Sequence, residues 1–286
     1  MHSIHFLSVF RNGTRWSILI FLPVISLSYN DLNINIYLYY IMLHTIANSD
    51  HHYAIYTMGF YIVFTAYYIV DNLLLKISPK YIALDNEKRT YVVSNIIKSL
   101  LLGSITPIAG TILYQTMYLD QWNNNLIKNI GILYAIPDGV SLALVNKMHM
   151  TTKIHHIIVC IFNMISIHNN YEEDSIVRCM VIYACFSCFA FIVNLLLGVR
   201  FLHDNKKIGI FMARASMYIY MLCCLINWAW HGKYIHTLVD KCNGGYCQIT
   251  IPAYCGMIMM LAWDDIKLNH WLYKESKIEC KKIKDQ

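Results

Sequence analysis

The stretch from Tyr134 to His168 holds the ionisable residues that could do chemistry. Asp138 interrupts one apolar segment, and the adjacent histidines His155 and His156 open the next. A carboxylate near two imidazoles suits general-base or nucleophilic catalysis near neutral pH. Two other roles fit the histidine pair. The histidines could only cap their helix toward the lipid headgroups, or bind metal. We predict no metal site, because neighbouring residues do not share a helical face as i, i+4 pairs do.

These groups lie in segments apolar enough to enter a bilayer. The 286-residue chain is 57% hydrophobic and only 14% charged, with a mean hydropathy of +0.42. Soluble domains carry about 25% charged residues, so this chain has too few to cover a water-facing surface. We predict an all-α, multi-pass transmembrane helical bundle, because backbone groups in lipid must pair within their segment. The formal charge of +6 is scattered between apolar runs, which indicates membrane topology rather than a nucleic-acid partner.

About seven helical spans are expected, six of them around a central cavity. They cover residues 53–75, 91–119, 126–146, 154–168, 176–202, 208–230 and 250–273. Residues 1–52 form an N-terminal lumenal or interfacial segment in this prediction, and 16–47 could add a further span. A basic tail, 274–286, follows the last helix.

Lysine and arginine gather in alternate connectors. The basic segments are residues 76–89, 147–153, 200–207 and 274–286. The positive-inside rule therefore places the C-terminus in the cytosol. Lys282 and Lys284 resemble a di-lysine retrieval signal, so the endoplasmic reticulum is the expected compartment. Cys242 and Cys247 then share a lumenal loop, where a local disulfide and two free thiols both stay open.

Further polar residues are expected at the depth of Asp138, which lies about 12 Å from the cytosolic end of its helix. They are Lys98, Asn194, Arg214, Asp264 and Asp265, together with the histidine pair. Because charged groups in a bilayer usually face a protein interior, we predict one polar cavity that opens toward the cytosol. Lys98 could instead extend to the interface, and Arg214 could form a structural ion pair with Asp264 or Asp265.

Asp138, the basic connector after it and the run Ile154-His155-His156-Ile157-Ile158-Val159 resemble the core of the TLC domain. This multi-pass membrane family includes the ceramide synthases. The likeness is most specific over residues 134–166 and extends more weakly over 91–273. It implies a six-helix membrane domain around a central cavity, with the helix at 53–75 before it.

In ceramide synthases the matching histidine pair belongs to the active site, where a fatty acyl group passes from acyl-CoA to a sphingoid base. The resemblance therefore implies catalytic roles for His155 and His156. Asp138 would orient the reacting imidazole, which acts as base or acyl-accepting nucleophile. Acyl-CoA would be a co-substrate, and no other cofactor is expected.

The helix after the histidines separates the functional interpretations. Ceramide synthases carry acids there, but residues 176–202 contain no Asp or Glu. Phe191, Asn194 and Arg200 look more like the non-synthase branch, whose members are linked to membrane lipid composition. The leading prediction is therefore a protein that binds lipid or regulates lipid composition through the cavity. A ceramide-synthase-like N-acyltransferase comes second, and a small-solute transporter comes third because no inverted repeat is visible. Membrane lipid is the expected partner, and the oligomeric state stays open.

Overall fold

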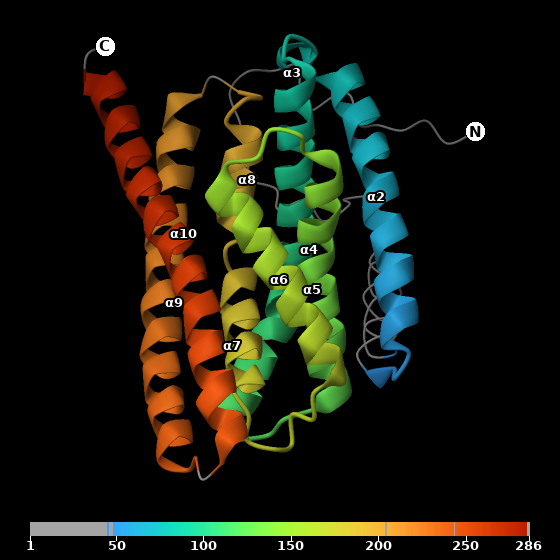
Figure 1. The fold of residues 1–286 in the computed structure, drawn as a ribbon. Helices are drawn as coiled ribbons and strands as arrows, with labels where there is room; N and C mark the ends of the chain where they lie inside the picture. Colours follow the sequence, from blue (N-terminus) through green and yellow to red (C-terminus); the bar gives the residue numbers. More distant parts are fainter. Residues whose placement is uncertain (1–44, 46–47, 204, 243, 285–286) are drawn as a thin grey trace, which may run out of the picture. The chain divides into compact units, whose positions relative to one another are not determined.

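The computed structural model describes residues 45, 48–203, 205–242 and 244–284. Within these ranges every regular element is a helix (Figure 1). The helices are α2 (His52–Ile77), α3 (Pro79–Ile82), α4 (Asn86–Met117), α5 (Asn124–Leu144), α6 (Met150–His168), α7 (Val177–Cys188), α8 (Phe191–Val199), α9 (Lys206–Asp240) and α10 (Gly245–Lys284). The predicted all-α fold is confirmed. The predicted N-terminal segment, with its candidate span at 16–47, lies almost wholly outside the described residues.

Six helices are long and apolar enough to cross a membrane, namely α2, α4, α5, α6, α9 and α10. The pair α7 and α8 makes a seventh candidate span that is bent by 45°. These seven match the predicted spans one for one. The main differences are at the ends of α9 and α10, which continue past the predicted 208–230 and 250–273. An apolar run marks only the part of a helix that lies in the membrane. The helix itself can continue into water, because polar residues form the same backbone hydrogen bonds there.

Side-chain caps fix where several helices begin. Asp85, Asn123 and Asn205 each accept a hydrogen bond from a backbone N–H in the first turn of α4, α5 and α9 respectively. The first turn of a helix leaves such N–H groups without a backbone partner, and Asp or Asn oxygens supply one. The connectors before these helices are therefore set by local sequence.

The bend between α7 and α8 frees the carbonyl of Cys188 at the end of α7, and side chains of neighbouring helices hydrogen-bond to both halves of the bent pair. The Thr106 hydroxyl donates to the carbonyl of Cys188 at 3.1 Å. Ser216 donates to the carbonyl of Ile192 at 3.2 Å. Inside a membrane a broken helix persists only where protein groups pair the freed backbone. The bent span is therefore held between α4 and α9.

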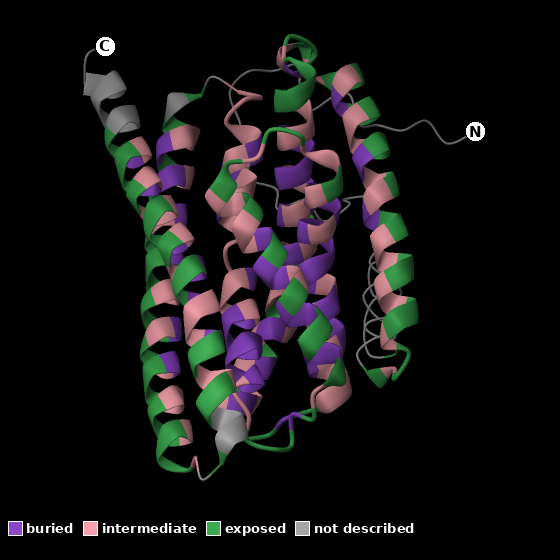
Figure 2. Cartoon of the chain, viewed as in Figure 1, coloured by how far each residue is buried: buried purple, intermediate pink, exposed green. Residues whose placement is uncertain are grey.

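The bundle buries its apolar core mainly between α4, α5, α6 and α7, and leaves the outer faces of α2, α9 and α10 exposed (Figure 2). Those outer faces carry large apolar side chains, among them Ile62, Ile69, Leu222 and Leu225. Contiguous apolar patches of this kind are unfavourable in water, whereas contact with lipid chains carries no such cost.

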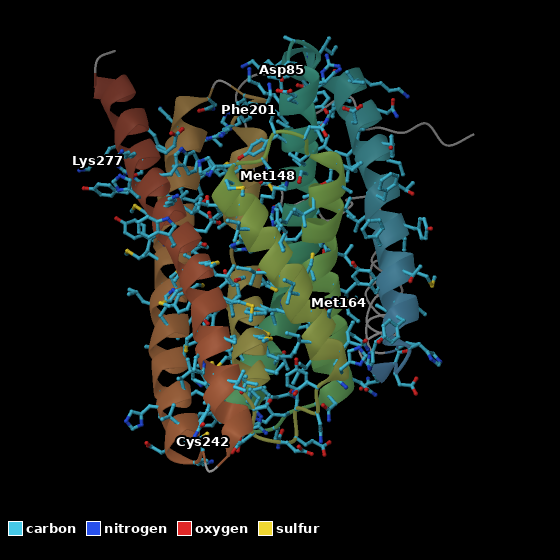
Figure 3. All side chains as sticks on the ribbon, in the orientation of Figure 1. Asp85, Met148, Met164, Phe201, Cys242 and Lys277 are labelled. Carbon is cyan, nitrogen blue, oxygen red and sulfur yellow. The ribbon has the colours of Figure 1, made fainter. Side chains whose placement is uncertain are left out.

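The connectors alternate between the two ends of the bundle. Asp85, Met148 and Phe201 lie near one end, and Cys242 lies at the other (Figure 3). The predicted basic connectors therefore share an end. Cys242 carries a free thiol, and the side chain of Cys247 is outside those described.

Candidate functional site: a polar cavity among six spans

A cavity of about 670 Å³ lies within the bundle, in the half that ends at the connector of residues 145–149. Side chains from α4, α5, α6, α9, α10 and the bent pair α7 and α8 line it. Among the described residues, α2 contributes no lining side chain. The expectation of six spans around a central cavity is confirmed.

The three predicted catalytic residues meet at this cavity. His155 and His156 line it, and Asp138 is fully buried behind them. Nδ1 of His156 lies 2.9 Å from Oδ1 of Asp138, within ion-pair distance, but the alignment leaves that nitrogen without a hydrogen bond. The ammonium of Lys98 donates to the same carboxylate oxygen. Lys98 therefore points inward and does not extend to the interface.

A second carboxylate faces the other histidine. Nδ1 of His155 lies 3.4 Å from Oδ2 of Asp264 on α10. The two imidazole rings are nearly perpendicular, at 88°, with centroids 5.7 Å apart. Because Nδ1 of each ring is buried, Nε2 is the nitrogen that can meet a ligand in the cavity. An imidazole whose Nδ1 faces a carboxylate is the arrangement used for general bases and nucleophiles.

The neighbouring acid, Asp265, has a different environment. It is only 4% exposed, and its Oδ1 accepts hydrogen bonds from the hydroxyls of Tyr220 at 2.7 Å and Tyr183 at 3.5 Å. Both tyrosines line the cavity, whereas Asp265 does not. Its contacts position these rings in the cavity wall.

Two predicted cavity residues remain, Asn194 and Arg214, and only Asn194 lines the cavity. The side-chain nitrogen of Asn194 donates to the carbonyl of Ala190 at 3.2 Å. Arg214 is exposed on α9 and is not among the lining residues. Depth along a span can be counted from the sequence, but the direction in which a helical residue projects depends on packing. The faces of α9 toward the bundle instead carry Ser216 and Tyr220.

Several lining residues were not predicted. They are Tyr91, Tyr134, Lys147, His149, Tyr183, Arg200, Tyr220, Lys267 and Trp271. Helical spacing could have found two of them, because Lys267 and Trp271 follow Asp264 at i+3 and i+7 and so share its face. Arg200 lies close to the rings of Phe201, at 4.7 Å, and Trp271, at 4.8 Å. The contact between Arg200 and Trp271 could not be predicted from a sequence pattern, because it joins the end of α8 to α10.

Beyond the cavity the bundle is closed by apolar packing. Tyr134 and Tyr183 line the cavity and also a smaller chamber of about 40 Å³ in the other half of the bundle. That chamber is otherwise lined mostly by apolar side chains such as Ile112, Ile130 and Phe162. The two tyrosines therefore form the floor of the polar cavity.

Comparisons of the chain with protein-family models, curated proteins and solved structures find no match. Fold and hydropathy alone define the class to which the chain belongs. It is an integral, multi-pass helical membrane protein with six candidate spans, or seven with the bent pair.

Proposed function

We propose that the protein binds a membrane lipid in the polar cavity and thereby regulates membrane lipid composition, as a TLC-like protein of the non-synthase branch. The observation that carries the proposal is the cavity of about 670 Å³ enclosed by membrane-spanning helices. Small-molecule sites are usually of about 300–1,000 Å³. A cavity of this size at membrane depth suits part of a lipid better than a solvated ion.

The lining changes character with depth, as an amphipathic ligand requires. Lys147, Arg200 and Lys267 lie toward the connector end, whereas Leu102, Tyr134 and Tyr183 lie deepest. A lipid would place an anionic or polar head among the cations and direct its chain toward the aromatic floor. Apolar burial would stabilise the chain by about 0.8 kcal/mol per CH₂ group.

The resemblance of residues 134–166 to the TLC core supports the same function, and the six helices around a cavity agree with it. We assign residues 91–273 to the TLC-like domain. By the positive-inside rule, the connector end of the cavity faces the cytosol, with the basic tail on the same side. The endoplasmic reticulum is the proposed compartment.

A second candidate function is N-acyl transfer, and one observation favours it. His155 and His156 each face a carboxylate, and Nε2 of each ring is left for the cavity. The nitrogen could remove a proton from an attacking amine, or attack a thioester carbonyl and expel the thiolate. Asp264 on α10 would supply the acid that residues 176–202 lack.

Lipid analysis tests both functions. For binding, the full chain purified in mild detergent is compared with Leu197→Trp. Leu197 lines the cavity, so the larger side chain should fill part of it. Leu225→Trp on the exposed face of α9 is the matched control. We expect one lipid class to copurify with the wild type and the control, and to be depleted at least tenfold in Leu197→Trp. Equal lipid content in all three proteins would contradict the proposal.

For acyl transfer, the chain is expressed in cells deficient in ceramide synthase, beside a His155→Ala/His156→Ala double variant. Ceramides that return with the wild type and vanish with the variant would establish the transferase. Unchanged lipidomes with both proteins folded in the membrane would exclude it and leave lipid binding in the lead.

A further inference from the structure

The cluster behind the cavity wall brings three metal-ligating side chains together. One candidate ligand atom from each of Asp138, His155 and His156 lies within 4.8 Å of the others. Adjacent residues on a helix diverge, so the sequence pattern alone predicts no shared ligand. The structure resolves this geometry, because the carboxylate comes from α5 and the two perpendicular rings approach it from α6.

The cluster holds one buried polar atom that has no partner, Oδ2 of Asp138. Nδ1 of each histidine lies within ion-pair distance of a carboxylate but is not aligned for a hydrogen bond. The side chains of Asp138 and His156 are only 0% and 9% exposed. Buried polar atoms in proteins nearly always have a partner, and an orphaned one costs about 1–3 kcal/mol. Oδ2 of Asp138, beside two imidazoles, therefore indicates a ligand at this cluster.

We propose that Asp138, His155 and His156 bind a divalent transition-metal ion, with Zn²⁺ as the first candidate. Two imidazole nitrogens and one carboxylate oxygen form a donor set that zinc takes in catalytic sites, where a fourth position stays open. Here the ion would lie at the cavity wall, because both histidines line the cavity. A bound ion would hold a water molecule or an oxygen of the lipid and polarise it.

The surrounding charges favour a dication. Within this group the two carboxylates of Asp138 and Asp264 face the single ammonium of Lys98, which leaves one net negative charge when the histidines are neutral. Lys98 holds Oδ1 of Asp138 and leaves Oδ2 for the metal. Groups that hold a ligand's second atom in this way orient metal ligands, and their loss commonly weakens binding about 10–100-fold.

Metal analysis of the full chain tests the site. Tag-free protein in detergent is stripped with EDTA, incubated with ZnCl₂, passed over a desalting column and analysed by mass spectrometry for zinc per chain. We expect close to equimolar zinc in the wild type. His155→Ala and His156→Ala should each weaken zinc binding at least tenfold. His236→Ala, an exposed histidine near the end of α9 that is remote from the cavity, should retain it.

Folding is checked separately, because His156 is buried. Each variant must be monodisperse, and zinc should raise the melting temperature of the wild type and of His236→Ala but not of the two cluster variants. Cobalt absorption gives a second readout, since four-coordinate Co²⁺ bound to nitrogen and oxygen is visibly coloured.

Folded wild-type protein that retains no zinc would overturn the proposal, and so would cluster variants that retain as much zinc as the wild type. Lipid content is measured on the same samples. A chain that copurifies lipid without binding metal would refute the metal site alone, which keeps the two proposals separable.

Discussion

Lys98 and Asp138 form an ion pair inside the membrane-spanning part of the bundle, with side chains only 13% and 0% exposed. Such a pair contributes little net stability, because desolvation offsets the Coulomb attraction. Loss of one partner is a different matter, since it leaves an uncompensated charge in a low-dielectric interior. The pair is therefore better understood as a device that holds the carboxylate of Asp138 in position beside His156.

Asp138→Leu should accordingly destabilise the metal-free protein by about 3–5 kcal/mol, because Lys98 is left buried and unpaired. The double variant Lys98→Met/Asp138→Leu should recover most of that loss. Unfolding in detergent, followed by intrinsic fluorescence, measures both. Equal destabilisation of the single and double variants would show that the charge of Lys98 is not what matters.

An acid in the connector between α6 and α7 links three segments. Oδ2 of Asp174 accepts a hydrogen bond from Lys241 at 2.9 Å, and Arg178 pairs with Oδ1. The Lys241 hydrogen bond, with the charge of Arg178 adding to it, holds the pKa of Asp174 below its ordinary value of 3.8. A lowered folded-state pKa contributes stability that is present above the unfolded value and is lost as pH falls through the folded value.

Asp174→Asn should therefore lower the melting temperature at neutral pH, and the difference from wild type should vanish as pH falls below 3.8. Loss of the pair with Lys241 should contribute under about 1 kcal/mol of this effect, because the side chains of Asp174 and Lys241 are well exposed. Glu173→Gln is the control, since Glu173 accepts from the amide of Asn170. A constant difference at every pH would mean that packing, not ionisation, explains the effect of Asp174→Asn.

At the scale of elements, α4 and α8 approach each other closely at Gly198. A Cβ added to Gly198 would lie 2.9 Å from Cγ1 of Ile96 and 3.3 Å from the carbonyl oxygen of Val92. The backbone of α4 cannot move away cheaply. The α4 helix also carries Lys98, so this contact fixes one side of the site.

Gly198→Ala should destabilise the protein by about 1–3 kcal/mol through overpacking and should displace α8 from α4. Gly256→Ala on α10 is the matched control, because an added Cβ meets nothing within 4 Å there. It should be neutral or slightly stabilising through helix propensity. Thermal unfolding compares the two, and similar melting temperatures would contradict the close approach.

The elements themselves were largely predictable. Seven spans follow from apolar runs of sufficient length, and the shared depth of Asp138, the histidines and Asp264 follows from counting residues along each helix. What the sequence could not supply is the direction of each side chain around its helix. Asp264 and Asp265 are adjacent, yet only Asp264 lines the cavity, and Arg214 projects outward. Rotation of a helix depends on contacts between distant segments, such as that between Arg200 and Trp271.

For the whole molecule, the alternation of connectors makes a topology testable. We expect the connector of residues 145–149 on the cytosolic side and the one at 241–244 in the lumen. Asn146→Cys should react with a membrane-impermeant maleimide in cells whose plasma membrane alone is permeabilised, and Gly244→Cys only after all membranes are opened. The unmodified chain corrects for its native thiols. Reaction of Gly244→Cys under the first condition would invert the proposed orientation.

The two tyrosines at the floor of the cavity restrict how a ligand can enter and leave it. With Tyr134 and Tyr183 in place and mostly apolar packing below them, the cavity in the described bundle is closed at this end and is not a channel through the bundle. A molecule that enters must leave by the same rim or sideways between helices. If the cavity binds lipid as proposed, exchange is a competition between occupants, and the residence time of one lipid sets the rate at which the next can bind.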